Sequence, residues 1–316
     1  MQTMIRDFNT GDRIEGYYLI KALNLKTSST NKKYLDLMLA DRSGEVNAKI
    51  WDVDEDIEQE YQIGTIVKVR GDVTLWNEQH QLKVIKTRPM EEGDEVDYED
   101  LIPSAPLRSQ DMVEFIWSKV QQVGNPEIKR LLEHALVTYR DKLEYYPAAM
   151  RNHHAIRSGL LYHLYRMMES GEALCRIYGL NWDLLLAGIL LHDIEKLNEM
   201  DANELGIVSG YTVEGQLLGH IVTGITQIDR WCRELDISDE LRILIQHMIL
   251  SHHYQPEYGS PKKPHFAEAE LLHHLDMIDA RIYDIQKANL ETRPGAFSEP
   301  IFSLERRKVY HPKLED

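Results

Sequence analysis

The stretch LLLAGILLHDIEKLNEM, Leu184 to Met200, decides the fold of most of this chain. Its first half is an unbroken apolar run, and the run ends at His192 and Asp193, after which charged residues follow at once. Such a run is typical of a helix that is buried on all sides. Imidazole and carboxylate groups are strong metal ligands at neutral pH, so the end of this helix is expected to carry chemistry.

Helix-forming patterns continue on both sides of this stretch. Apolar residues recur at a spacing of three to four in the segments 114–123, 127–139, 159–178, 214–235, 239–253 and 267–286. The pattern predicts an all-α helical bundle over residues 111–316. An acidic, proline-containing linker is expected over residues 91–110.

The first ninety residues follow a different pattern, in which apolar and polar residues alternate. This period of two predicts strands over 13–27, 33–40, 45–51, 65–76 and 81–89, with a short acidic helix over 52–61 and a hairpin at 77–80. Three strands, a helix and two strands is the layout of an OB-fold, a five-stranded barrel that commonly binds oligonucleotides. Another small β-barrel is the alternative for residues 1–90.

Charge and cysteine content narrow the function classes. The net charge is −16, which argues against wholesale coating of nucleic acid, yet residues 1–90 are nearly neutral, with 13 Lys and Arg against 14 Asp and Glu. Only two cysteines occur, and neither a signal peptide nor a membrane-spanning run is evident, so a cytoplasmic protein is expected. The oligomeric state is left open, a homo-oligomer included.

Histidines and aspartates recur at the predicted helices of the second domain. Each group lies on or just after an apolar segment, and the groups are His163, His192 with Asp193, His220, His252 with His253, and Asp276. Any one histidine on an apolar helix is more often a core or surface residue than a ligand. Five groups at intervals of one helix plus its connection instead predict a shared metal site in the interior of the bundle.

The order His, His-Asp, His, His-His, Asp resembles the HD-domain metallophosphohydrolases over roughly residues 145–290. With the preceding barrel, the chain resembles the YhaM-type 3′→5′ exoribonucleases. The matching stretches are LADRSGEVNAKIWDV, HHAIRSGLLYH, LLHDIEK, GQLLGHI, SHH followed by YGSPKKP, and EAELLHHLDMIDA.

The resemblance implies a metal-dependent 3′→5′ exonuclease that degrades single-stranded RNA, with DNA as a second candidate substrate. It implies as metal ligands His163, His192, Asp193, His220, His252, His253 and Asp276. Asp193 and Lys196 are the expected catalytic residues, with Lys196 placed to contact a phosphate. The expected cofactor is a pair of divalent transition-metal ions, with Mn favoured and Co, Fe, Ni or Zn as alternatives.

Two positions depart from the resembled family. Glu195 stands where the family usually has glycine, and Tyr162 stands where it usually has glutamate. Either Glu195 points to solvent in a turn that needs no glycine, or its charge acts on the substrate phosphate. We expect Glu195→Gly to keep the metals and to leave kcat/KM unchanged or raise it.

Several basic and aromatic residues are candidates for binding the strand. They are Lys32, Lys33, Tyr34, Trp51 and Trp76 in the barrel, and Lys262 and Lys263 in the helical domain. Aromatic rings stack on bases and lysines contact phosphates, although strand aromatics are just as often core. Tyr17, Lys26 and Arg281 are weaker candidates, and His273 is expected to support a ligand.

Two rival functions remain open from the residues. One is a phosphodiesterase for a small cyclic or signalling nucleotide that uses the same metals. The other is a non-catalytic regulator that binds single strands. The barrel argues against the first rival, and the intact set of ligand residues argues against the second.

Overall fold

The computed structural model describes residues 2–28, 31–51, 53, 61–76, 79–150 and 154–314. The chain divides into two compact units, Met1–Ser104 and Ala105–Asp316. Most of the segment predicted as an acidic short helix, 52–61, lies outside the described residues, as do two residues of the predicted hairpin at 77–80.

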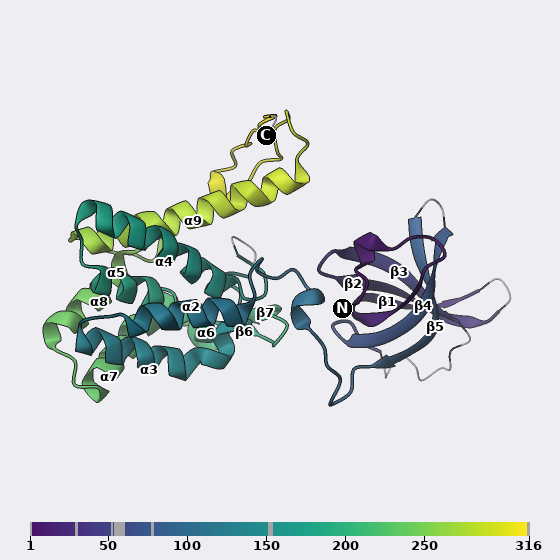
Figure 1. Ribbon diagram of the computed structural model, residues 1–316, viewed down its shortest axis with the longest axis horizontal. Coiled ribbons are helices and arrows are strands. Elements are labelled where there is room, and N and C mark those ends of the chain that lie inside the picture. Colours follow the sequence, from purple (N-terminus) through teal and green to yellow (C-terminus); the bar gives the residue numbers. More distant parts are fainter. Residues whose placement is uncertain are drawn as a thin grey trace. The chain divides into compact units, whose positions relative to one another are not determined.

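The first unit is a closed barrel of five strands (Figure 1). The strands are β1 (Arg13–Thr27), β2 (Lys33–Asp41), β3 (Gly44–Trp51), β4 (Ile66–Trp76) and β5 (Gln79–Pro89). The order around the barrel is β1-β2-β3-β5-β4, and β1 closes it by pairing with β4. The pairs are antiparallel except for β3 with β5. This is the predicted OB-fold barrel.

Apolar side chains at alternate positions along the strands fill the interior of the barrel. In β2, Leu35, Leu37 and Leu39 are buried while Asp36 and Met38 are only half-buried, because successive side chains of a strand point to opposite faces. Short 3₁₀ helices flank the strands at Ile5–Asp7 and Tyr98–Asp100. The 3₁₀ helix Tyr98–Asp100 contacts the barrel, because its Asp100 forms an ion pair with Arg42 in the turn between β2 and β3.

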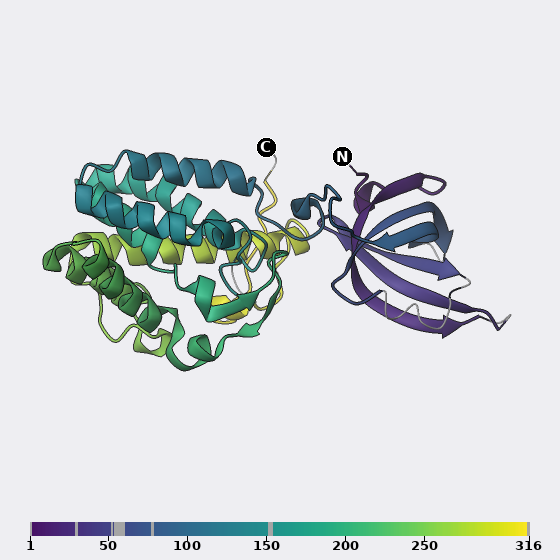
Figure 2. The ribbon, with the colours of Figure 1, turned by 90° about the horizontal axis from the view of Figure 1, so that it is seen from below.

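The second unit is mainly helical. Its helices are α2 (Ser109–Gln121), α3 (Pro126–Leu143), α4 (Gly159–Tyr178), α5 (Trp182–Leu191), α6 (Lys196–Glu199), α7 (Val213–Glu234), α8 (Asp239–Ser251) and α9 (Ala267–Glu291). Helix α5 is buried along its whole length from Leu184 to Leu191. Helices α4 and α9 run beside each other and both pack on α5 (Figure 1, Figure 2). The helical bundle predicted from the apolar spacing is therefore confirmed.

The helical unit also contains elements that the apolar spacing did not predict. A two-stranded antiparallel sheet, β6 (Met200–Ala202) with β7 (Val208–Tyr211), joins α6 to α7. Short 3₁₀ helices occur at Pro256–Tyr258 and Phe302–Leu304. Among the described residues, no helix has both the length and the apolar content that crossing a membrane requires.

Candidate metal centre

The helices of the second unit bring the predicted ligand groups to one buried point. Helix α5 ends at Leu191, so His192 caps it and Asp193 lies in the turn that follows. His252 caps α8 in the same way, with His253 next in the chain. The remaining groups come from within helices: His163 from α4, His220 from α7 and Asp276 from α9.

All five histidines are held through the same ring nitrogen. Nδ1 of His192 lies 2.9 Å from the carbonyl of Ile189, and Nδ1 of His252 lies 2.7 Å from that of Ile249. The other acceptors are the Tyr258 carbonyl for His253, the Asp279 carboxylate for His163 and the Glu199 carboxylate for His220. Carbonyls and carboxylates only accept, so each Nδ1 donates, and each ring in its neutral form presents the lone pair of Nε2.

Several of these Nε2 atoms gather around Asp193. Nε2 of His192 lies 3.3 Å from Asp193 Oδ2, whereas Nε2 of His220 and of His252 lie 3.3 Å and 3.7 Å from Oδ1. These three nitrogens and Oδ1 are buried and make no well-aligned hydrogen bond. Buried polar atoms are normally satisfied, so such a convergence points to a ligand that binds them together.

The ligand atoms fall into two groups that share Asp193. One group contains Asp193 with His220, His252 and His253, and the other contains Asp193 with His163 and His192. Asp276 extends the second group, since its Oδ1 lies 3.4 Å from Nε2 of His163. Imidazole nitrogens and carboxylate oxygens suit divalent transition metals. The donor set therefore fits a site for divalent metal.

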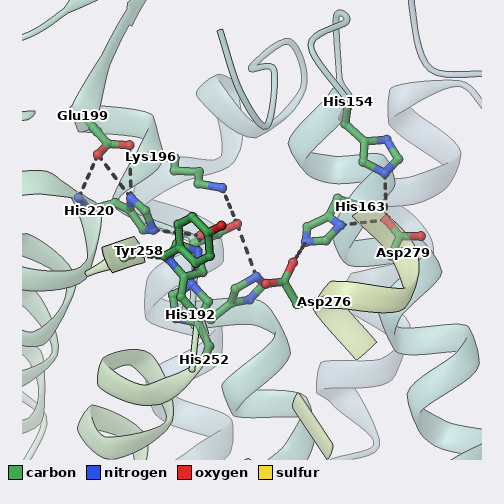
Figure 3. A network of polar contacts seen from close by, with 12 residues as sticks. His154, His163, His192, Lys196, Glu199, His220, His252, Tyr258, Asp276 and Asp279 are labelled. Carbon is green, nitrogen blue, oxygen red and sulfur yellow. Dashed lines mark hydrogen bonds and ion pairs between the residues drawn. The ribbon is translucent and has the colours of Figure 1, made fainter. Parts of the chain in front are cut away.

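A break in helix α7 places His220. Gly219 has φ 71° and ψ 160°, a conformation that L-residues rarely adopt, and it interrupts the helix one residue before His220. Glu199, at the end of α6, then accepts hydrogen bonds from both the backbone amide and the ring of His220. Figure 3 shows the contacts between Glu199 and His220, and Nε2 of the same ring lies 3.3 Å from Asp193 Oδ1.

The electrostatics favour a charged site in the metal-free protein. Burial would raise the pKa of Asp193, but the Lys196 cation and the contact with His192 outweigh it and hold that pKa well below its usual range. Burial lowers the pKa of His163, yet its hydrogen bonds to Asp276 and Asp279 prevail and raise it to about 9. For His252 burial dominates and keeps the pKa well below its ordinary value.

Asp279 forms a support behind His163 that the sequence analysis missed. Its Oδ2 lies 2.7 Å from Nδ1 of His163 and 2.7 Å from Nε2 of His154 (Figure 3). Its Oδ1 lies 2.6 Å from Nε of Arg166. Both carboxylate oxygens of Asp279 are therefore engaged by side chains of the protein, so we interpret Asp279 as an orienting carboxylate and not as a ligand. Its position three residues after Asp276 was the available signal.

Glu195 and Lys196, the first charged residues after Asp193, contact different partners. Lys196 is 9% exposed and its Nζ lies 2.7 Å from Asp193 Oδ2, so the predicted catalytic lysine is paired with the predicted catalytic aspartate. Glu195 is 5% exposed and accepts hydrogen bonds from the Tyr139 hydroxyl (2.6 Å) and the Asn198 amide (2.9 Å). The interpretation of Glu195 as solvent-facing is therefore wrong. Its φ of −77° needs no glycine.

The basic loop after α8 is linked to the metal centre. Lys262 and Lys263 are exposed, and Nζ of Lys263 lies 4.7 Å from the ring centre of Tyr254. That ring stacks on His273, whose Nδ1 donates to the carbonyl of His252. His273 thus supports a predicted ligand through its backbone. Arg281, a weaker candidate for strand binding, instead pairs with Glu305.

Aromatic side chains cluster on the outer face of β2 and β3 in the barrel. Tyr34 and Trp51 are cross-strand neighbours and stack with ring centres 4.6 Å apart. Lys49, which the sequence analysis did not single out, lies within 6 Å of the rings of Tyr34, Trp51 and Trp76. Trp51 and Trp76 are 43% and 63% exposed, so they are not core residues.

The other barrel candidates lie on β1 and at or just before the start of β2. Tyr17 is on β1, with Lys68 over its ring. Lys26 forms an ion pair with Asp36. Lys32 is exposed and Lys33 is half-buried at the start of β2.

The fold and the site define an HD-domain protein with an OB-fold barrel before it. Residues 160–281 match the family model described as HD domain, and residues 20–89 match the one described as OB-fold nucleic acid binding domain. The chain is 40% identical over 306 residues to the 3′-5′ exoribonuclease YhaM of Geobacillus sp. (strain WCH70), covering 96% of this chain and 94% of that protein. The chain therefore belongs to the YhaM family of 3′-5′ exoribonucleases.

Two solved structures show weaker likeness. One is the second OB-fold domain of replication protein A from Methanococcus maripaludis, 18% identical, covering 30% of this chain and all of that one, with a TM-score of 0.25. The other is a replication protein A heterotrimer bound to ssDNA, 16% identical, covering 30% of this chain and 66% of that one, with a TM-score of 0.21.

Proposed function

We propose that this protein is a 3′→5′ exonuclease that hydrolyses single-stranded RNA with two divalent transition-metal ions. The observation that supports it best is the convergence of buried imidazole Nε2 atoms on both oxygens of Asp193. The family relationship supplies the substrate class and the direction of attack, because the curated relative is named a 3′-5′ exoribonuclease. Mn is our first choice of metal, ahead of Co, Fe, Ni and Zn.

The count of two ions follows from how Asp193 is shared. Its Oδ2 faces His192, while its Oδ1 faces His220 and His252. We propose one ion held by His163, His192, Asp193 and Asp276, and a second held by Asp193, His220, His252 and His253. Lys196 also bonds Oδ2, but a carboxylate oxygen has two lone pairs, so it can serve both partners.

Divalent metal ions at such a site polarise a phosphodiester and lower the pKa of water toward neutrality, which provides the nucleophile for hydrolysis. The chain's own residues prepare the site for this chemistry. The five Nδ1 donors fix the ring orientations before metal arrives. Lys196 keeps Asp193 ionised and has two further N–H groups, which we assign to a non-bridging phosphate oxygen.

The two units divide the work in this proposal. The barrel, predicted over residues 1–90, holds the strand on Tyr34, Trp51 and Trp76, with Lys32, Lys33 and Lys49 on its phosphates. The helical domain, predicted over 111–316, cuts it, and Lys262 and Lys263 guide the backbone. Single strands fit best because stacking on these rings requires unpaired bases. Both cysteines are free and buried, which suits the predicted cytoplasmic location.

An end-labelled oligonucleotide tests the proposal. Protein purified without chelators is assayed for metal content and then incubated with 5′-labelled 20-nucleotide RNA. We expect about two metal ions per chain and a ladder of products that shorten from the 3′ end. An intact oligonucleotide together with hydrolysis of a small cyclic nucleotide would favour the phosphodiesterase instead. Binding without any hydrolysis would favour a non-catalytic regulator.

A further inference from the structure

The C-terminal segment of the helical unit has an unusual charge for this protein. Between Arg293 and Leu314 there are five Lys and Arg residues against two Asp and Glu, a net charge of +3 in a chain whose net charge is −16, and Glu315 and Asp316 then follow and reduce the net charge of residues 293–316 to +1. The same segment holds two of the chain's five phenylalanines, Phe297 and Phe302. Cations interleaved with aromatic residues are the composition of surfaces that bind single-stranded nucleic acid.

This segment folds back on itself as an irregular hairpin beyond α9. Ser298 donates to the carbonyl of Val309, and Ile301 donates to that of Arg307. The hairpin is the yellow segment that extends from the end of α9 in Figure 1. At its tip, Glu305 and Arg306 have φ of 52° and 60°, an uncommon conformation for residues with side chains. The backbone at the tip of the hairpin therefore lies in a region that residues with a Cβ seldom adopt.

The hairpin leaves its aromatic rings outside. Phe302 is 84% exposed, Phe297 is 65% exposed and Tyr310 is 48% exposed, whereas Leu304 is fully buried and anchors the hairpin. Arg306, Lys308 and Lys313 are exposed and form no ion pair among the described residues. A hairpin that served only to cap the bundle would turn its aromatic side chains inward.

The hairpin is attached close to the metal centre along α9. Glu305 pairs with Arg281, and the Ser303 hydroxyl donates to the buried carboxylate of Asp284. Asp284 follows the predicted ligand Asp276 by eight residues, which is about 12 Å along a helix. The basic and aromatic surface therefore begins within a few nucleotides' length of the point where the strand would be cut.

We propose that this hairpin is a second binding surface for single-stranded RNA, and the proposal rests on the proposed function. Phe297, Phe302 and Tyr310 would stack on bases, while Arg306 and Lys308 would contact phosphates next to the cut site. The positive charge of the hairpin favours nucleic acid as its partner, because a net positive segment on an acidic protein attracts a polyanion. The pattern of aromatic rings gives no basis for reading a particular sequence.

A charge-reversal variant of the full-length protein tests the surface. Arg306→Glu with Lys308→Glu is compared with Arg176→Glu, an exposed arginine at the far end of α4. Binding of a 20-nucleotide single-stranded RNA is measured over a series of salt concentrations with a hydrolysis-inactive Asp193→Asn background. We expect the double variant to bind about tenfold more weakly and to lose about 1.4 from the salt slope, at ~0.7 per phosphate contact. Phe302→Ala should also weaken binding about tenfold.

The outcomes separate this surface from the proposed function. Unchanged affinity and salt slope in the double variant, or an equal change in Arg176→Glu, would overturn the hairpin proposal. A change in the oligomeric state of the RNA-free protein with an unchanged salt slope would make the hairpin a contact between copies, which also overturns it. If the double variant binds RNA more weakly but the wild-type protein does not shorten RNA, the exonuclease proposal is wrong and the hairpin is still an RNA-binding surface.

Discussion

At the scale of single residues, the metal centre depends on the groups that hold the ligands. Each of the five histidines donates Nδ1 to an acceptor of its own, and two of those acceptors are carboxylates, Glu199 and Asp279. A carboxylate behind an imidazole fixes the ring and raises its basicity toward a metal. The candidate ligands could be named from the sequence because their order resembles a known family, and their role as ligands stays a prediction. The acceptors could not, because each depends on which helices meet.

Asp279→Ala tests the carboxylate behind His163. Loss of the Oδ2 acceptor should free the ring to rotate and lower metal affinity about 10- to 100-fold. Asp284→Ala is the matched control, since Asp284 is buried on the same helix and bonds Ser303 instead of a ligand. Calorimetric titration with Mn²⁺ measures both affinities. Equal affinities in the two variants would show that Asp279 does not orient the site.

The buried position of the Glu195 side chain could not be predicted from the sequence. Its partner Tyr139 lies 56 residues earlier in the chain, on α3, and no local pattern links the two. Their hydrogen bond accounts for a buried glutamate beside a metal site. The expectation that Glu195→Gly keeps the metals and leaves kcat/KM unchanged or raised stays a prediction, to which the loss of this hydrogen bond adds a cost in stability.

Glu195→Ala should destabilise the helical unit. The Tyr139 hydroxyl and the Asn198 amide would lose a buried acceptor, at roughly 1–3 kcal/mol. For a unit of this size that lowers Tm by about 2–4 °C per kcal/mol. Adding Tyr139→Phe removes the stranded hydroxyl, so the double variant should melt higher than the sum of the single losses predicts. An unchanged Tm in Glu195→Ala would contradict this account.

At the scale of secondary-structure elements, the position of His220 in the candidate metal centre depends on a break in helix α7. The apolar spacing predicts α2 to α5 and α7 to α9, because each has a buried stripe or is buried throughout. The kink at Gly219 and the β6–β7 sheet leave no periodic signal, and the apolar pattern of α7 runs straight through the kink. Yet this kink aims His220 at Asp193.

Gly219→Ala tests the kink. The backbone of Gly219, with φ 71° and ψ 160°, lies in a region that residues with a Cβ resist by roughly 1–3 kcal/mol, so the substitution should favour a continuous helix and turn His220 away from Asp193. We expect the protein to stay folded but to lose part of its bound metal. Gly224→Ala is the control in the same helix, since its added Cβ would make only ordinary van der Waals contacts, with Ile249 and Glu195. Full metal content in Gly219→Ala would rule out a role for the kink.

At the scale of the whole molecule, a strand-binding barrel and a cutting domain should respond differently to substrate length. The OB-fold could be predicted from strand order alone, whereas the cluster of Tyr34, Trp51, Trp76 and Lys49 depends on strand register and on β4. Binding energy that comes from a remote surface affects long substrates and not those too short to reach it.

Trp51→Ala with Trp76→Ala should weaken binding of long RNA. Stacking is worth about 1–3 kcal/mol per base, so KM for a 20-nucleotide strand should rise at least about tenfold. A dinucleotide should show a much smaller change. Both side chains are exposed, so little packing is lost. Trp117→Ala, an exposed tryptophan on α2, controls for the substitution itself. An equal loss on both lengths would mean that these rings support the fold and do not bind the strand.

Release of a 3′-terminal label tests the central claim most directly. Wild-type protein with Mn²⁺ should free the label of a 3′-labelled single-stranded RNA as a mononucleotide from the first turnover. Asp193→Asn keeps the side-chain shape but loses the charge shared by both ligand groups, so release should fall on the order of 10³-fold with an unchanged circular dichroism spectrum. Near-normal release by Asp193→Asn with normal helicity would contradict the account.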